Sequence, residues 1–62
     1  MRYWLKELRK DLNMSQLQVA QLSGIHRVHY TFIENGRRRP SPQVAQRIGK
    51  VLNFDWTLFF ID

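Results

Sequence analysis

The stretch QLQVAQLSGIHRVHYTFIENG, residues 16–36, decides the fold of this chain. Its apolar residues recur at helical spacing in two short runs, residues 16–23 and 27–34. Gly24 stands one residue past the first run, where the chain must enter a left-handed conformation that strains other residues. The pattern predicts two short helices joined by a tight turn. The side chains expected to point inward are Val19, Ala20, Ile25, Tyr30 and Ile33.

Ala20 has a small side chain, which allows the backbones of the two predicted helices to approach closely where they cross. A helix pair of this length with a short glycine turn is the helix-turn-helix unit. The second helix of such a unit, the recognition helix, enters the major groove of DNA. We therefore expect a helix-turn-helix unit over about residues 16–35.

The chain resembles the helix-turn-helix DNA-binding domains of Cro/C1-type regulators, also called XRE-like or lambda-repressor-like. The matching residues occur in order and at the right spacing, and the resemblance covers nearly the whole chain. They are Ser15 and Gln16 at the start of the first helix, Val19 and Ala20 within it, Gly24 and Ile25 at the turn, and Ile33, Glu34, Asn35 and Gly36 at the end. The resemblance implies an all-α fold, a compact bundle of four to five short helices.

Length and composition limit the classes of function. Sixty-two residues suffice for one small domain over residues 1–62, near the lower limit for a single hydrophobic core. The chain has no cysteine, so disulfides and cysteine-based metal sites are excluded. His26 and His29 have no carboxylate or cysteine close by in sequence, and two ligands are too few for a metal site. We therefore expect no metal and no cofactor.

The sequence also argues against an enzyme, because it has no nucleophile–base pair, no paired carboxylates at helical spacing and no glycine-rich phosphate loop. No apolar run is long enough to span a bilayer, and Met1 opens on a polar-studded helix rather than a signal peptide. We expect no membrane contact and a cytoplasmic protein, a bacterial or phage-type regulator by the resemblance. The net charge of +5 favours nucleic acid as partner, a signal that ribosomal and membrane-surface proteins share.

Residues 2–12 carry Leu5, Leu8 and Leu12 at the spacing of one helical face, which predicts a helix before the helix-turn-helix unit. Arg9 lies near this stripe, and by itself it is most simply a solvated surface residue. The resemblance implies instead a largely buried ion pair between Arg9 and Glu34.

Ser15 and Gln18 form the Ser-x-x-Gln pattern of a capping box at the start of the next helix. The free N–H groups and positive dipole at such a helix end suit a DNA phosphate. Gln16 can donate its side-chain amide to the same phosphate, and the resemblance implies this contact. A plain polar helix start explains the same residues, and the two interpretations are compatible.

The resemblance assigns base reading to Arg27, Val28, Thr31 and Phe32 on the outer face of the recognition helix, with His29 at the margin. Arg27 can bond guanine O6 and N7 with two parallel donors. Val28 and Phe32 suit thymine methyl groups, and Thr31 suits a base edge or a phosphate. The alternative for Val28 and Phe32 is an exposed apolar surface or a protein interface. His26 stands where the family more commonly has Ser or Thr as helix cap, so this helix start is expected to be poorly capped.

Asn35 and Gly36 end the recognition helix, with Gly36 in the left-handed conformation. Arg37, Arg38 and Arg39 follow on a loop. The resemblance places this loop along the DNA backbone and matches Asn35 to a phosphate contact. A solvated run of charges is the alternative interpretation of the three arginines.

A fourth helix is predicted from Ser41 as cap and Pro42 as first residue to residue 52, with Gly49 marking close packing against another helix. Asp55 caps a last short helix, residues 56–60, within a segment crowded with large apolar residues. This segment either covers the edge of the core or forms a two-fold dimer contact, as it commonly does in the family. The residues predicted for such a homodimer are Phe54, Trp56, Phe59 and Phe60.

The sequence thus predicts a sequence-specific regulator of transcription that binds double-stranded DNA. Two copies would occupy a near-palindromic operator, with their recognition helices about one helical turn apart. Such a protein would act as a repressor by occupancy, without chemistry. The alternative is a protein-interaction or antitoxin-type module that binds a partner protein through its apolar C-terminal segment.

Overall fold

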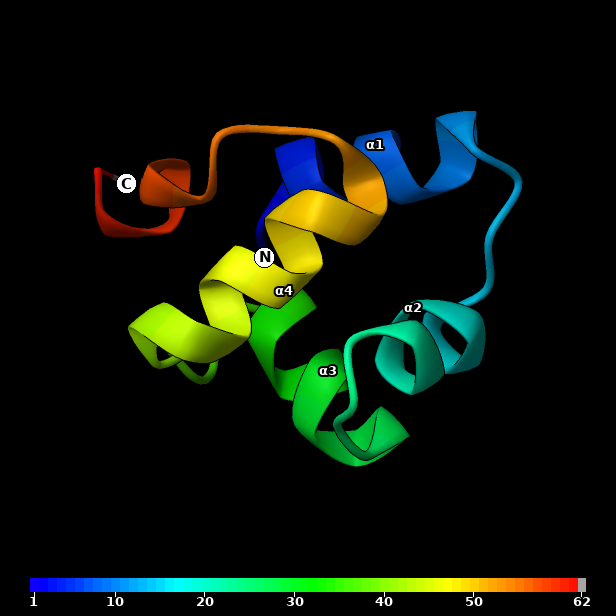
Figure 1. The fold of residues 1–62 in the computed structure, drawn as a ribbon, viewed down its shortest axis with the longest axis horizontal. Helices are drawn as coiled ribbons and strands as arrows, with labels where there is room; N and C mark the ends of the chain where they lie inside the picture. Colours follow the sequence, from blue (N-terminus) through cyan, green and yellow to red (C-terminus); the bar gives the residue numbers. More distant parts are fainter. Residues whose placement is uncertain (62) are drawn as a thin grey trace.

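The computed structural model describes residues 1–61, which form four α-helices and a short 3₁₀ helix and contain no strand (Figure 1). The elements are α1 (Tyr3–Asp11), α2 (Gln16–Leu22), α3 (Arg27–Glu34), α4 (Pro42–Leu52) and η1 (Trp56–Phe60). The predicted all-α helix bundle is confirmed. None of the helices in the described part of the chain is long and apolar enough to cross a membrane.

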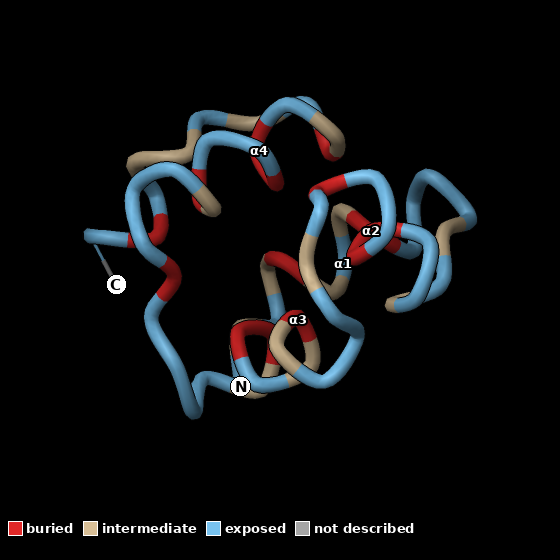
Figure 2. Tube along the Cα trace, turned by 60° about the horizontal axis from the view of Figure 1, so that its bottom comes forward, coloured by how far each residue is buried: buried red, intermediate tan, exposed pale blue. Residues whose placement is uncertain are grey.

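The helices surround one hydrophobic core. α2 packs against α3 and α4, α1 packs against α3, and η1 lies against α4. Figure 2 shows the buried segments of these helices turned toward the interior. Every element contributes to the core, whose buried residues are Leu5, Val19, Ala20, Tyr30, Ile33, Ala45, Ile48, Leu52 and Phe59.

The helix ends follow the capping residues of the sequence. The Ser15 side chain accepts from the backbone N–H of Gln18, and the Gln18 side chain accepts from the backbone N–H of Ser15, so the predicted capping box is present. Ser41 caps α4, which begins with proline, and Asp55 caps η1. His26 makes no side-chain hydrogen bond at the start of α3, as expected for a poor cap.

The tight turn of the helix-turn-helix unit is built as predicted. Gly24 has a φ of +70°, a conformation that is unstrained for glycine, and it allows α3 to start three residues later. Around this turn, Ile25 packs partly buried against the core, and Val19 and Tyr30 have no exposed surface.

Leu12 lies outside the apolar face on which the sequence placed it. α1 ends at Asp11, and Leu12 is 47% exposed. The chain turns immediately afterwards through Asn13, whose φ is 56°. Because Leu12 stands past the last helical residue, the helical spacing from Leu5 and Leu8 no longer determines its direction.

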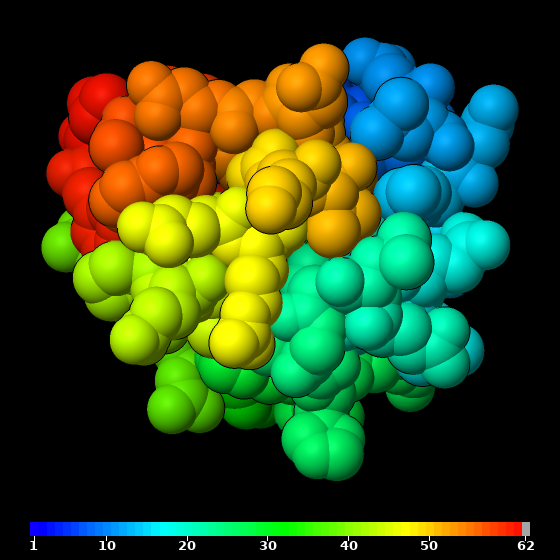
Figure 3. Space-filling view, viewed as in Figure 1, coloured from blue at the N-terminus to red at the C-terminus, as the bar shows by residue number. Residues whose placement is uncertain are grey.

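The C-terminal segment covers the core, and the prediction of Phe59 as a dimer contact is wrong. Phe59 has no exposed surface, and its ring lies 5.2 Å from the ring of Trp4 and 5.6 Å from that of Phe54. Phe54 and Trp56 are partly buried against the same core. In Figure 3, this orange and red segment covers the upper left of the face beside α4. The large apolar residues of this segment that remain exposed are Leu58, Phe60 and Ile61.

Gly49 marks a close approach between α4 and the turn that follows it. A Cβ at this position would lie 2.9 Å from the carbonyl oxygen of Phe54 and 3.0 Å from the Cβ of Trp56. The sequence predicted close packing at Gly49 against another helix, and the neighbour is the turn at Phe54 and the first residue of η1.

We expect Gly49→Ala to destabilise the protein although alanine is the better helix former by about 1 kcal/mol. The added methyl group meets a backbone oxygen that cannot rotate away, and overpacking of this kind costs about 1–3 kcal/mol. Urea denaturation measures the loss. Gln46→Ala, at an exposed position of the same helix, is the control and should change stability little. Equal stability of the Gly49→Ala and wild-type proteins would contradict the close approach.

Candidate nucleic-acid interface

The two faces of α3 differ in burial. Tyr30 and Ile33 have no exposed surface, whereas Val28 is 60% and Phe32 37% exposed, and Arg27 is exposed beside them. The side chains of α3, coloured green, protrude at the lower edge of the molecule (Figure 3). His29 and Thr31, at the sides of the helix, are half-buried. The outer face of α3 therefore presents a cation and two apolar side chains to the solvent.

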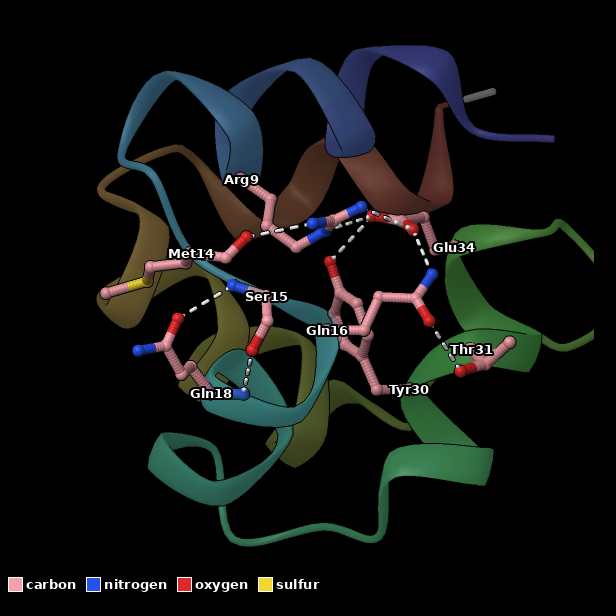
Figure 4. Close-up of polar contacts among 8 residues, drawn as sticks. All are labelled: Arg9, Met14, Ser15, Gln16, Gln18, Tyr30, Thr31 and Glu34. Atoms are coloured by element: carbon pink, nitrogen blue, oxygen red, sulfur yellow. Dashed lines mark hydrogen bonds and ion pairs between the residues drawn. The ribbon is translucent and has the colours of Figure 1, made fainter.

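The inner face of α3 ends in a buried ion pair. Arg9 donates from Nε to Oε1 of Glu34 at 2.8 Å and from Nη2 to Oε2 at 3.2 Å (Figure 4). It also donates from Nη1 to the carbonyl oxygen of Met14 at 2.8 Å. The side chains of Arg9 and Glu34 are 10% and 1% exposed. The ion pair that the family resemblance implied is thus present.

The same carboxylate collects two further donors. Tyr30 donates its hydroxyl to Oε1 of Glu34 at 3.2 Å, and Gln16 donates Nε2 to Oε2. The Oε1 of Gln16 in turn accepts from the hydroxyl of Thr31 at 3.0 Å. Figure 4 shows Gln16 between Glu34 and Thr31. Its side chain therefore connects the start of α2 to two residues of α3.

The hydrogen bonds of this network restrict how Gln16 and Thr31, two predicted DNA contacts, can bind DNA. An amide nitrogen carries two hydrogens, so after its bond to Glu34 the side chain of Gln16 keeps one for a phosphate. Thr31 gives its only hydroxyl hydrogen to Gln16, which leaves its oxygen as an acceptor. In this arrangement Thr31 suits an amino group on a base edge and does not suit a phosphate.

The charges of the network are tied to one another. Burial raises the pKa of Glu34, but the hydrogen bonds from Arg9 and Gln16 outweigh it and hold this pKa below its ordinary value. The hydrogen bond to Glu34 raises the pKa of Arg9, and burial together with the charge of Glu34 raises the pKa of Tyr30. Glu34 and Arg9 are therefore both ionised at neutral pH, with Tyr30 neutral.

Arg37, Arg38 and Arg39, which we call the arginine loop, continue directly from the exposed face of α3. Arg37 and Arg38 donate their backbone N–H groups to the carbonyl oxygen of Phe32, at 2.9 and 3.2 Å. Gly36, with a φ of +79°, makes the turn between them and the helix. All three arginines are exposed, and the guanidinium of Arg37 lies 5.9 Å from the centre of the Phe32 ring. Basic groups therefore flank the outer face of α3 at its C-terminal end.

Of the residues predicted as DNA contacts, Arg27, Val28, Phe32 and the arginine loop are all exposed. Arg39 is turned toward the C-terminal segment, with its guanidinium 5.7 Å from the centre of the Phe60 ring. Asn35 is half-buried at the end of α3, and Gln16 lies at the start of α2 next to Thr31. Sequence reasoning did not predict Arg2, which contacts the end of α3 and the arginine loop. No pattern could reveal it, because its partners lie 31 and 36 residues away in sequence.

An exposed helix beside a basic loop, held in a helix-turn-helix unit, defines a DNA-binding protein of the helix-turn-helix class. The helix-turn-helix family model matches residues 5–59. The chain belongs to the XRE-type helix-turn-helix family of transcriptional regulators, which bind DNA and are not enzymes.

Three curated proteins illustrate the relationship. An uncharacterized HTH-type transcriptional regulator of Bacillus subtilis, YqaF, is 50% identical over 62 residues, which are all of this chain and 82% of that protein. An uncharacterized HTH-type transcriptional regulator of Archaeoglobus fulgidus is 38% identical over 53 residues, 86% of this chain and 75% of that protein. The ImmF control region 10 kDa protein of Bacillus phage phi105 is 35% identical over 51 residues, 82% of this chain and 57% of that protein.

We expect Glu34→Gln to lower the free energy of unfolding at neutral pH by about 3–5 kcal/mol, because it leaves the buried charge of Arg9 without its partner. The same change should also make the free energy of unfolding depend less on pH in the acid range. The pKa of Glu34 in the folded protein lies below the ordinary value of 4.5, so the unfolded chain takes up a proton first as the pH falls. The stabilisation by Glu34 is therefore complete above pH 4.5 and is lost as the pH falls through its pKa in the folded protein.

Urea denaturation from neutral pH into the acid range measures this loss. Glu7→Gln, at an exposed position of α1, is the control and should keep the acid dependence of the wild type. The same acid dependence in Glu34→Gln and wild-type protein would show that Glu34 does not hold the fold through its charge.

Proposed function

We propose that this regulator reads duplex DNA by placing the outer face of α3 in the major groove. The observation that carries the proposal is that Arg27, Val28 and Phe32 are exposed on a helix whose opposite face is locked into the core. Arg27 bonds guanine O6 and N7 with two donors, and Val28 and Phe32 contact thymine methyl groups. His29 lies at the margin of the reading surface, and Thr31 accepts from a base amino group.

The residues around α3 are proposed to bind phosphates and to fix the register of the helix in the groove. Gln16 donates its remaining amide hydrogen, and Asn35 and the arginine loop contact the backbone beyond the C-terminal end of α3. Three exposed guanidinium groups on one short loop support this assignment, because each phosphate that they neutralise adds about one unit to the salt dependence of binding.

We further propose that two copies bind a near-palindromic operator and repress transcription by occupying it. Leu58, Phe60 and Ile61 are the exposed large apolar residues of the C-terminal segment, and they can pack against a second copy. A dimer would set the two α3 helices about one helical turn apart on the duplex. Occupancy requires no ligand and no chemistry, in accord with a family of binding proteins.

A second candidate is a protein-interaction or antitoxin-type module that binds a partner protein through the same C-terminal residues. The exposure of Ile61, at 75%, favours a protein contact at this end of the chain. An apolar protein contact responds little to salt, whereas DNA binding weakens steeply as salt is added.

Selection of bound sites from a pool of random duplexes, at about 50 and about 200 mM salt, tests the proposed function. We expect an enriched inverted repeat with half-sites about ten base pairs apart, bound less tightly at the higher salt. Salt-sensitive binding without an enriched sequence would refute the reading of bases by α3 and favour the protein-interaction module.

Arg27 and Arg38 should differ in a way that separates base reading from backbone contact. Arg27→Ala should weaken binding to the selected site by about 1–3 kcal/mol and leave binding to unrelated duplexes unchanged. Arg38→Ala should weaken binding to every sequence alike and reduce the salt dependence by about one unit. Fluorescence anisotropy measures both, with Arg47→Ala, exposed on α4, as the control. Uniform loss from Arg27→Ala, or altered base preference from Arg38→Ala, would contradict these assignments.

A further inference from the structure

Arg2 bridges three parts of the fold. Its Nη1 donates to the carbonyl oxygen of Ile33 at 2.6 Å and to that of Arg38 at 3.2 Å. Its backbone N–H donates to the carbonyl oxygen of Glu34 at 2.7 Å, and its guanidinium lies 5.6 Å from the centre of the Phe59 ring. One side chain thus connects the end of the recognition helix, the backbone of the arginine loop and the aromatic core.

These contacts lie where α3 most needs partners. The last carbonyl groups of a helix have no N–H partner inside the helix. The carbonyl oxygen of Ile33 accepts from the backbone N–H of Gly36 at 3.2 Å as well as from Arg2, and that of Glu34 accepts from the backbone N–H of Arg2. The arginine loop starts from the same place, with the N–H groups of Arg37 and Arg38 on the carbonyl oxygen of Phe32. Arg2 holds the loop from the other side, through the carbonyl oxygen of Arg38.

The residue before Arg2 also lies along the loop. A Cβ built on Gly36 would stand 3.4 Å from the backbone nitrogen and 3.6 Å from the Cα of Met1. Residues 1 and 2 therefore cover the turn between α3 and the arginine loop. The hydrogen bond from Arg2 to the carbonyl oxygen of Ile33 at this turn is partly buried.

We propose that Arg2 is a positioning residue for DNA binding, which holds the backbone of the arginine loop in the conformation that meets the phosphates. The inference rests on the proposed contact between this loop and the DNA backbone. A loop that is already ordered in the free protein loses less conformational entropy on binding, and the affinity is correspondingly higher. Arg2 acts through Arg38 and Arg39, and its own Nη1 is directed to protein carbonyl groups.

A double-mutant cycle tests this role. Binding to an arbitrary duplex is measured at about 50 and about 200 mM salt for Arg2→Gln, for Arg38→Ala with Arg39→Ala, and for all three changes together. We expect Arg2→Gln alone to weaken binding on the order of three- to tenfold and to reduce the salt dependence. When the two loop arginines are already absent, Arg2→Gln should have little further effect. Lys10→Gln, at an exposed position of α1, removes the same charge and is the control.

Amide hydrogen exchange of the free proteins separates loop positioning from global stability. In Arg2→Gln, we expect faster exchange at Arg37 and Arg38, whose N–H groups bond the Phe32 carbonyl oxygen, and unchanged exchange at Ile33 inside α3. If Arg2→Gln does not fold, Arg2→Lys is measured in its place, because an ammonium group keeps the charge but lacks the planar fork of donors.

Three results would overturn the inference. Equal weakening by Arg2→Gln with and without the loop arginines would show that Arg2 acts independently of them. Faster exchange at every amide would show that Arg2 only stabilises the whole fold. Wild-type affinity of the Arg38→Ala, Arg39→Ala protein would show that these two arginines do not touch DNA, and this result alone would also refute their proposed phosphate contacts.

Discussion

The carboxylate of Glu34 is the point on which the arrangement of the helices depends. It is almost fully buried, and it is held by Arg9 from α1, Gln16 from α2 and Tyr30 from its own helix. A buried charge is tolerable only when its partners are all in place, because each missing donor leaves a desolvated group behind. The first three helices are therefore fixed relative to one another at the end of the recognition helix.

The same hydrogen bonds also position residues of the proposed DNA surface. Gln16 and Thr31, both predicted DNA contacts, belong to the same network and are oriented by it. On the other side of the α3 terminus, the arginine loop is anchored to Phe32 and Arg2. The carbonyl groups of Ile33 and Glu34 and the Glu34 carboxylate are satisfied by the protein itself, and the outer face of α3 remains exposed.

The sequence predicted most of the fold because the helix ends are encoded locally. Capping and turn residues lie next to the helix ends that they determine, and apolar spacing identifies the inner faces. For α2, α4 and the turn before α3, these residues are Ser15, Gly24, Ser41 and Pro42. Apolar spacing also placed Leu12 on a helical face, although α1 ends before it. The family resemblance offered Phe59 as a dimer contact, although its packing against Trp4 and Phe54 buries it.

The spacing of residue types along the sequence does not predict contacts between residues that are far apart in the chain. The ion pair between Arg9 and Glu34 came from the family resemblance, since periodicity alone made Arg9 a surface residue. The bonds that join Gln16 to Thr31 and Glu34, and Arg2 to Ile33 and Arg38, depend on how the helices cross. For this reason the resemblance and the residue types could predict which residues form the candidate interface. They could not predict that Gln16 and Thr31 have hydrogens already engaged within the protein.

The most direct test of this account is a map of the backbone amide chemical shifts of the protein during titration with a duplex carrying its selected site. We expect the largest changes on α3 from Arg27 to Phe32, at Gln16 and in the arginine loop, smaller changes at the C-terminal residues where two copies would meet, and little change in α1 at a one-to-one ratio of half-site to protein. Largest changes at Leu58, Phe60 and Ile61, with α3 unaffected, would contradict it and would place the functional surface at the C-terminus.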